Sequence, residues 1–125
     1  MDYARAATGA AYVPYSHFPV GAAVQTEDGA IFTGANVENA SYPLACCAER
    51  TAVYAAVNAG HTVITAVAVT APNVETVTPC GGCRQVLNEF KPADAEMAVI
   101  LDGPELTILT LADLLPRAFG PHDLD

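Results

Sequence analysis

The chain has 125 residues, of which 52% are hydrophobic, and its 5 Lys and Arg against 14 Asp and Glu give a net charge of −9. This length predicts a single domain, residues 1–125, with enough chain for a hydrophobic core. Nucleic-acid binding draws much of its affinity from Lys and Arg that neutralise phosphates, so the acidic balance argues against a nucleic acid polymer as partner.

We expect neither a membrane-spanning segment nor an export signal in this sequence. No stretch reaches the roughly 18 apolar residues that a membrane span needs. The segment Met1 to Arg5 lacks the basic region and apolar run of a secretory signal. Cysteines that share metal-type spacing favour reduced thiols. We therefore expect a cytoplasmic protein without membrane contact.

The first elements in the chain are a helix and two strands. Residues 2–11 predict a short helix that ends before Val13-Pro14. Residues 20–26 and 30–34 predict two strands. Because Glu27-Asp28-Gly29 is a hairpin signal, these two strands should be antiparallel.

The middle of the chain predicts two helices around one strand. Residues 47–59 are rich in Ala, lack Pro and are closed by Gly60, which indicates a helix. Residues 63–69 form a nearly continuous apolar run, typical of a buried strand. Residues 81–90 predict a second helix, which stops before Pro92.

The last elements complete an alternating pattern. Residues 97–101 and 106–109 predict two more strands, and residues 111–118 predict a final helix that contains Pro116. Strands that alternate with helices indicate an α/β layered sheet. With an antiparallel hairpin first and helix crossovers between the later strands, the sheet should be mixed.

Two cysteine motifs indicate a metal site. Cys47-Ala48-Glu49-Arg50 and Pro79-Cys80-Gly81-Gly82-Cys83-Arg84 offer Cys47, Cys80 and Cys83 as three thiolate ligands for one zinc ion. Structural zinc sites usually fill four positions with Cys or His, whereas catalytic sites supply three and leave the fourth to water. No His lies near either motif. The pattern therefore favours a catalytic zinc.

The residues around these cysteines suit the activation of water. A bound zinc lowers the pKa of its water, and Glu49 could take the proton and pass it to the substrate. Three thiolates give the zinc centre a net negative charge, which Arg50 and Arg84 would offset. The helix N-termini would help, because Cys47 lies at the start of one predicted helix and Cys80 and Cys83 at the start of the other.

Other interpretations of the cysteines stay open. The Cys80–Cys83 pair could be a redox dithiol, although the thioredoxin-like context is missing. A structural zinc could take a fourth ligand from Cys46 or a His, in an interaction module without catalysis. Cys46 could also replace Cys47 as a ligand. Cys47 is preferred because it sets the C-x-E spacing, which leaves Cys46 as a small buried hydrophobe.

Further segments give the chain a resemblance to a known family. C-A-E followed by P-C-x-x-C is similar to the zinc deaminase signature in a Cys-only variant. Together with the other segments it resembles the small homotetrameric cytidine deaminases, over nearly the whole chain and in the family's order. The segments that carry the resemblance are Tyr15-Ser16-His17-Phe18-Pro19-Val20-Gly21-Ala22, Asn36-Val37-Glu38-Asn39-Ala40, Cys47 to Ala52, Pro79 to Gln85 and Phe119 to Leu124.

The resemblance implies a fold and an activity. The fold would be a three-layer α/β/α arrangement with a mixed five-stranded sheet. The activity would be zinc-dependent hydrolysis of free cytidine, and of deoxycytidine, to uridine or deoxyuridine plus ammonia, in pyrimidine salvage. Each subunit of a homotetramer would bind one zinc. The nearest alternative is another small-molecule aminohydrolase of this fold, such as the related blasticidin-S deaminases.

The resemblance also implies roles for individual residues. Zinc would be held by three cysteines, and Glu49 would shuttle protons. Other residues would contact the ribose hydroxyls, the base and the zinc-bound thiolates. These roles fall to Cys47, Cys80 and Cys83 for zinc, Asn36 and Glu38 for ribose, Phe18 and Ala48 for the base, Phe119 for the base in a neighbouring subunit, and Arg50 for the thiolates.

The same positions also have interpretations that need no family. Asn36 and Glu38 are two positions apart in an extended stretch, so both side chains should point to the same face. This arrangement could bind a diol, and a solvated strand edge would look the same. Phe18 alone would be interpreted as a core residue, and Phe119 as an apolar side chain that must pack or stay exposed. A neutral nucleoside suits Glu38 and the acidic field better than a nucleotide.

Overall fold

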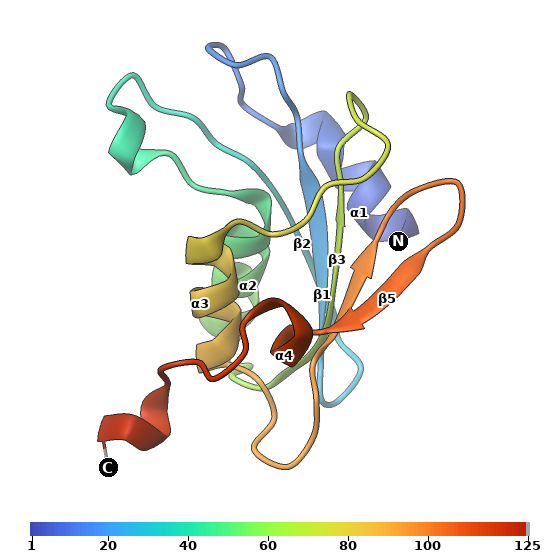
Figure 1. The fold of residues 1–125 in the computed structure, drawn as a ribbon. Coiled ribbons are helices and arrows are strands. Elements are labelled where there is room, and N and C mark those ends of the chain that lie inside the picture. The colour runs from blue at the N-terminus through green and yellow to red at the C-terminus, as the bar shows by residue number, and fades with distance from the viewer. Residues whose placement is uncertain (125) are drawn as a thin grey trace.

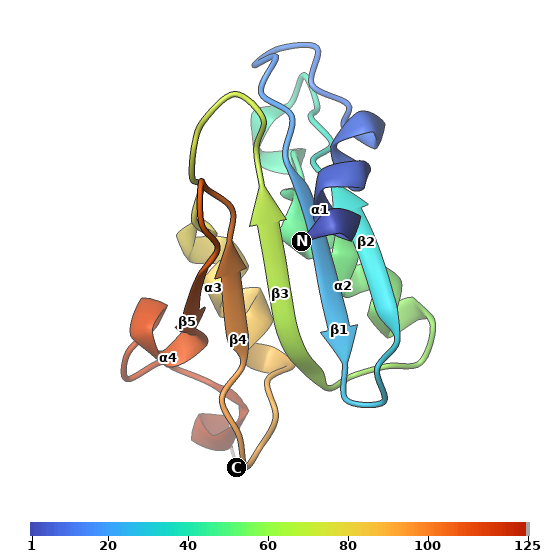
Figure 2. The same cartoon turned by 90° about the vertical axis from the view of Figure 1, so that its right-hand side faces the viewer.

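The computed structural model describes residues 1–124 and contains a mixed five-stranded sheet with the strand order β2-β1-β3-β4-β5. The strands are β1 (Gly21–Thr26), β2 (Ile31–Ala35), β3 (Ile64–Thr70), β4 (Ala98–Leu101) and β5 (Thr107–Thr110). β1 is antiparallel to both of its neighbours, β3 is parallel to β4, and β5 is antiparallel to β4 (Figure 2).

Helices cover both faces of this sheet. The α-helices are α1 (Asp2–Ala7), α2 (Ala48–Asn58), α3 (Gly81–Glu89) and α4 (Leu111–Leu114), and 3-10 turns span Thr8–Ala10, Tyr42–Leu44 and Pro121–Leu124. α1 lies on one face, against β1, and α2 and α3 lie side by side on the other (Figures 1 and 2). The three-layer α/β/α prediction is confirmed. No helix within residues 1–124 is both long enough and apolar enough to cross a membrane.

The predicted elements are confirmed except at three places. The first helix ends at Ala7 and continues only as a 3-10 turn. The last helix ends at Leu114 rather than residue 118, because Pro116 lacks an N–H and disfavours helical backbone in the residue before it. The strands β4 and β5 form an antiparallel pair without a crossover helix, so that part of the topology prediction was wrong. The intervening residues 102–106 are too few for a crossover.

The main core lies between the sheet and the helices α2 and α3. Its fully buried members include Val24, Val53, Ile64, Val67, Leu87, Met97 and Val99. α2 approaches β2 closely at Gly34, where a Cβ atom would overlap the Thr51 side chain and the Ala52 nitrogen. The absence of a side chain at Gly34 therefore lets the first turns of α2 pack directly on the sheet, which fixes the position of the residues that begin this helix.

Candidate active site

Three cysteine sulfurs converge where the N-terminal ends of α2 and α3 meet. Cys47 and Cys80 are the N-cap residues of α2 and α3, and Cys83 lies in the first turn of α3. The Sγ atoms of Cys47 and Cys80 are 3.8 Å apart, and those of Cys80 and Cys83 are 3.5 Å apart. All three Sγ atoms lie within 4.8 Å of one another. The structure thus brings together the three cysteines that the motifs predicted as ligands of one metal.

The spacing of these sulfurs fits a tetrahedral zinc site. A Zn–S bond measures about 2.3 Å, so two thiolates of a tetrahedral site lie about 3.8 Å apart. All the cysteines are free thiols, and thiolates are ligands that zinc prefers. Two helix N-termini, with N–H groups that lack partners within the helix, add positive potential at the same point. The donor set therefore fits zinc with one position left open.

Arg50 contacts the thiolates directly. Its Nη2 atom donates a hydrogen bond to Cys47 Sγ at 3.2 Å. The pKa of Cys47 is lowered to about 5, first by its hydrogen bond with Cys83 and then by the Arg50 guanidinium, despite partial burial. The negative sulfur in turn raises the pKa of Arg50. Arg50 therefore lies where a positive charge would offset the thiolates.

Arg84 makes different contacts from those of Arg50. Its Nε atom donates to the carbonyl of Pro79 at 2.7 Å and its Nη1 atom to the carbonyl of Leu114 at 2.9 Å. The guanidinium thus braces the start of α3 against the end of α4. Arg84 thus differs from Arg50 in its hydrogen bonds, and its contribution to the charge at the thiolates stays a prediction.

Cys46 lies outside the sulfur cluster. Its N–H donates to the carbonyl of Val37 at 2.8 Å, and the N–H of Val37 donates to its carbonyl at 2.9 Å. Consecutive side chains of an extended segment point to opposite sides, so this bridge directs Cys46 away when Cys47 faces the other sulfurs. Burial raises the pKa of the Cys46 thiol. The geometry favours Cys47 over Cys46 as a metal ligand.

Glu49 is a buried carboxylic acid beside the sulfur cluster. It lies in the first turn of α2, and only 4% of its surface is exposed. Burial raises its pKa above the ordinary value, and the charge of Cys47 adds to this shift. A carboxyl group with a raised pKa can both accept and donate a proton near neutral pH. Glu49 therefore has the electrostatic setting of a general acid and base.

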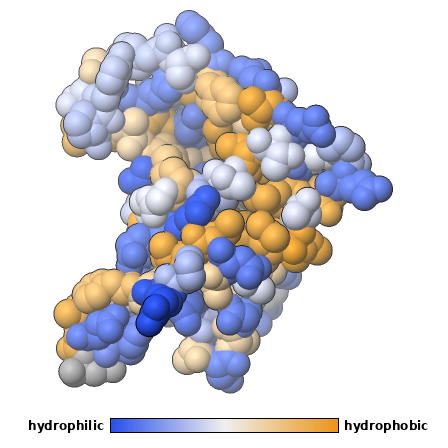
Figure 3. Space-filling view, in the orientation of Figure 1, coloured by the Kyte–Doolittle hydropathy of each residue, from blue (hydrophilic) through white to orange (hydrophobic). Residues whose placement is uncertain are grey.

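A cavity of about 140 Å³ brings the sulfurs and Glu49 together with other predicted residues. Its walls are formed by Val20, Asn36, Cys47, Ala48, Glu49, Val69, Val77, Thr78 and Cys80. An adjoining cavity of about 350 Å³ shares Asn36 and Cys47, and Glu38, Tyr42 and Arg50 also line it. Figure 3 shows this side of the molecule hollowed between the segment around Tyr42–Leu44 and the N-terminal end of α3.

Asn36 and Glu38 hold the segment before β1. The Oδ1 atom of Asn36 accepts a hydrogen bond from the N–H of Val20, and its Nδ2 atom donates to the carbonyl of Phe18, both at 2.9 Å. Glu38 Oε1 accepts the N–H groups of Tyr15 and Ser16, each at 3.1 Å. The two residues predicted to bind ribose therefore also support residues 13–20 as one wall of the site.

The two predicted aromatic contacts differ in position. Phe18 is half-buried, and its carbonyl is fixed by Asn36, but it is not among the residues that line the two cavities. Phe119 is 59% exposed and is not among the residues that line the two cavities. Its carbonyl accepts hydrogen bonds from Gln85 Nε2 at 2.9 Å and Asn88 Nδ2 at 3.1 Å. Within one chain the structure does not bring Phe119 to the site.

Several site residues were not anticipated. Val69, Val77 and Thr78 line the smaller cavity and Tyr42 the larger one. Val69 could have been found, because it lies near the end of a buried strand beside a parallel neighbour, where sites commonly form. Val77 and Thr78 directly precede Pro79-Cys80, and this closeness to the motif in the sequence could have indicated that they line the site.

Comparison with known proteins agrees with this geometry. Residues 1–99 match the family model described as the cytidine and deoxycytidylate deaminase zinc-binding region. The cytidine deaminase of Halalkalibacterium halodurans is 46% identical over 115 residues, which are 92% of this chain and 87% of the relative. The cytidine deaminase of Sporosarcina psychrophila is 48% identical over 116 residues, which are 91% of this chain and 84% of the relative.

Solved structures with the same fold carry the same name. The crystal structure of cytidine deaminase from Burkholderia pseudomallei matches with a TM-score of 0.86 and 44% identity, and covers 94% of both chains. That of cytidine deaminase from Mycobacterium tuberculosis matches with a TM-score of 0.82 and 43% identity, and covers 95% of this chain and 93% of the other. The likeness therefore extends over nearly the whole fold.

Proposed function

Because the chain belongs to the zinc-binding cytidine and deoxycytidylate deaminase family, we propose that it hydrolyses free cytidine, and also deoxycytidine, to uridine or deoxyuridine and ammonia. The observation that carries this proposal is the position of Glu49, which lies buried in one cavity with Cys47 and Cys80. A structural metal site needs no carboxyl group beside its ligands, whereas hydrolysis needs a group that can transfer protons next to an open metal position. The buried Glu49 therefore favours hydrolysis.

The residues divide the work of the reaction. A zinc ion held by Cys47, Cys80 and Cys83 would supply a water molecule whose pKa is lowered. Glu49 would carry the two protons of the attacking water, one to the ring nitrogen beside the amino-bearing carbon and one to the amino group, so that ammonia leaves while the water oxygen becomes the new carbonyl. Arg50 keeps the thiolates from making the centre too negative for this step. The Ala48 backbone and Phe18 hold the base.

The nucleoside is selected by groups around the two cavities. Asn36 and Glu38 both line the larger cavity, and their remaining hydrogen-bonding capacity suits hydroxyl groups. A phosphate would meet the Glu38 carboxylate, whose pKa is lowered first by its hydrogen bonds with Ser16. The net charge of −9 adds a further repulsion. These features support a neutral nucleoside, which is the substrate of a pyrimidine salvage reaction.

The proposed assembly is a cytoplasmic homotetramer of one domain, residues 1–125, with one zinc per subunit. Phe119 supports this proposal, because a large apolar side chain that is 59% exposed gains from burial against a neighbouring chain. Its carbonyl is held by Gln85 and Asn88, so the backbone of Phe119 keeps a fixed position beside α3 while its ring stays exposed. Light scattering that finds only monomer would contradict the assembly.

The activity is tested directly with purified protein and cytidine. Conversion to uridine lowers the ultraviolet absorbance, and we expect this loss in proportion to the enzyme added. Removal of the metal with a chelator should abolish the reaction, and added zinc should restore it. A panel that contains deoxycytidine, cytidine monophosphate and blasticidin S separates the nucleoside proposal from its nearest alternative. Turnover of blasticidin S without turnover of either nucleoside would refute it.

A further inference from the structure

The loop between β3 and α3 touches both walls of the site. Near its end, Val77 and Thr78 line the smaller cavity next to Cys80. Near its beginning, the Nδ2 atom of Asn73 donates a hydrogen bond to the carbonyl of His17 at 3.0 Å. His17 lies three residues before Val20, which also lines the smaller cavity. One loop therefore forms part of one wall and holds the backbone of the other.

This loop is anchored on both sides of Asn73. The Oγ1 atom of Thr70 donates to Asp102 Oδ2 at 2.7 Å, and the Oγ1 atom of Thr76 donates to the Asp102 carbonyl at 2.9 Å. Asp102 is in turn held by Arg5, whose Nη2 and Nε atoms donate to its carboxylate at 2.7 and 3.0 Å. The Asn73 amide therefore belongs to a fixed stretch of chain. Its hydrogen bond can for that reason fix the position of the His17 carbonyl.

His17 is the residue in that wall that needs such a support. Its φ angle is 55°, in the left-handed region, which is unfavourable for a residue with a Cβ atom. The N–H of His17 donates to the carbonyl of Val13 at 3.0 Å, and the next carbonyl, that of Phe18, is held by Asn36. The bond from Asn73 to the His17 carbonyl completes the restraint on this turn.

We propose that Asn73 is a positioning residue for substrate binding, which fixes the backbone from which the Phe18 ring is presented to the base. The proposal rests on the proposed role of Phe18. Asn73 itself is exposed and lines neither cavity. It therefore acts through His17 and Phe18, and its effect falls on the binding of the nucleoside rather than on proton transfer by Glu49.

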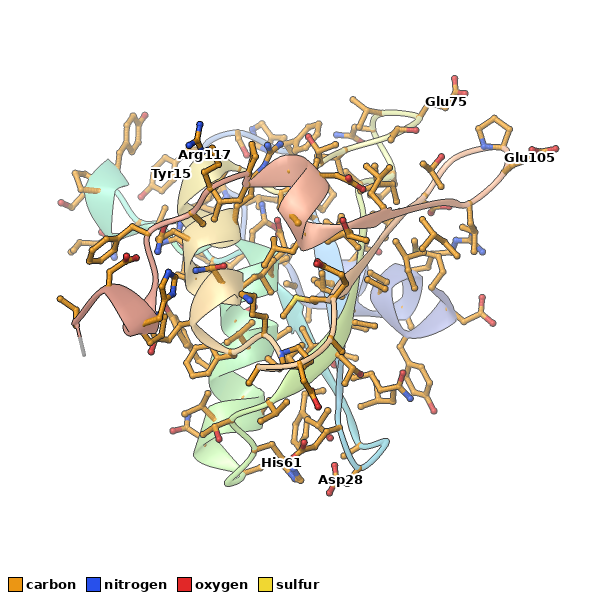
Figure 4. All side chains as sticks on the ribbon, turned by 60° about the horizontal axis from the view of Figure 1, so that its bottom comes forward. Tyr15, Asp28, His61, Glu75, Glu105 and Arg117 are labelled. Carbon is orange, nitrogen blue, oxygen red and sulfur yellow. The ribbon has the colours of Figure 1, made fainter. Side chains whose placement is uncertain are left out.

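The first test compares steady-state kinetics of Asn73→Ala with the unaltered protein. Loss of one hydrogen bond should raise KM for cytidine by roughly threefold to tenfold, with kcat, zinc content and Tm unchanged. Glu75→Ala is the matched control, since Glu75 lies on the same loop and points away from the molecule (Figure 4). Its KM should equal that of the unaltered protein. An unchanged KM for Asn73→Ala overturns the proposal.

A rescue experiment separates positioning from general loosening of the structure. Glycine adopts a φ of this kind at no steric cost, so His17→Gly in the Asn73→Ala background should lower KM again toward the original value. A general structural defect would not be repaired by a more flexible residue. Failure of the second substitution to lower KM therefore contradicts the role of His17 as the link.

A double-mutant cycle with Phe18→Leu tests the end of the chain of contacts. If Asn73 acts through the Phe18 ring, Asn73→Ala should raise KM much less in the Phe18→Leu background than alone. Fully additive penalties overturn the proposal. An unchanged KM for Phe18→Leu alone removes its premise and so also overturns it. Turnover of cytidine by the unaltered protein tests the proposed function separately from all of these outcomes.

Discussion

Arg50 and Cys47 are joined by a charge-assisted hydrogen bond within the first turn of α2, with 3.2 Å between Nη2 and Sγ. The Nε atom of Arg50 is buried and has no partner among residues 1–124. The guanidinium is thus held at the thiolate although one of its donors stays unsatisfied. A side chain in this position is better explained by the charge of the thiolates than by its contribution to folding.

Replacement of Arg50 should impair turnover while the metal stays bound. Hydrogen bonds to charged groups contribute about 1.5–3 kcal/mol, so Arg50→Gln should lower kcat/KM by roughly tenfold to a hundredfold. Zinc content, measured by metal analysis, should remain near one per subunit. Lys91→Gln removes the same charge from an exposed site and should have no effect. Equal losses in the two variants would show that only the overall charge matters.

Glu49→Gln should nearly abolish deamination. The amide keeps the size of the side chain but cannot take up a proton, and general acid–base catalysis contributes about a hundredfold to ten-thousandfold. We expect kcat to fall by at least that range while zinc is retained. Glu105→Gln is the control, because Glu105 lies at the outer end of the β4–β5 connection (Figure 4). Substantial turnover by Glu49→Gln would refute the assignment.

The choice between Cys46 and Cys47 can be decided by metal analysis. Cys46 is turned away by its backbone bridge to Val37, whereas Cys47 lies with Cys80 and Cys83. We expect Cys46→Ala to bind one zinc and retain activity, and Cys47→Ala to lose both. Zinc retained by Cys47→Ala but lost by Cys46→Ala would reverse the assignment.

Gly34→Ala should destabilise the fold. The added methyl would overlap Thr51 and Ala52 at the start of α2, and overpacking of this kind typically costs about 1–3 kcal/mol. Denaturant unfolding should show this loss. Gly9→Ala is the matched control, since nothing lies within 4 Å of the position of its Cβ. If both variants unfold at the same denaturant concentration, α2 does not pack tightly on β2 at Gly34.

The contribution of Asp102 to stability should depend on pH. Its pKa is held below the ordinary 3.8, first by the hydrogen bond with Arg5 and then by that with Thr70. The folded state therefore favours the carboxylate, and this stabilisation is present above about pH 4 and is lost as the pH falls through the depressed pKa. Asp102→Asn should lower the free energy of unfolding by about 1 kcal/mol at pH 7.

The pH dependence itself is the measurement that checks this assignment. The difference in unfolding free energy between Asp102→Asn and the unaltered protein should shrink as the pH is lowered from about 7 to about 3. Asp2 is the control, since its side chain is 98% exposed and lies 3.6 Å from the same Arg5. Asp2→Asn should change stability little at any pH. A difference for Asp102→Asn that grows toward low pH would contradict a depressed pKa for this carboxyl group.

The elements of the fold were predictable where local signals were strong. The hairpin signal at Glu27-Asp28-Gly29 is confirmed by β1 and β2, and Gly60 does close α2, with a φ of 94°. The helix predicted over residues 111–118 ends at Leu114 because the restriction from Pro116 outweighed the apolar pattern. The antiparallel pair of β4 and β5 could not be predicted from helix–strand alternation, which does not specify how short connections turn.

The site was predictable in its chemistry and less so in its contacts. The two motifs indicated the types and spacing of the groups that meet at the sulfurs, because ligand chemistry restricts residue identity. They carried no information about Arg84, whose carbonyl partners depend on where the end of α4 lies. The link from Asn73 to His17 joins residues 56 positions apart, and no periodicity signals such a contact.

The double duty of Asn36 and Glu38 limits how this pocket can be redesigned. Each already uses hydrogen-bonding atoms to hold backbone groups of residues 13–20. Replacing either residue to admit a different sugar would also remove hydrogen bonds that hold residues 13–20 in place beside the cavity. New selectivity would be reached more readily from Thr78, which lines the smaller cavity, than from Tyr42, whose ring packs edge-on against Tyr15 of that segment.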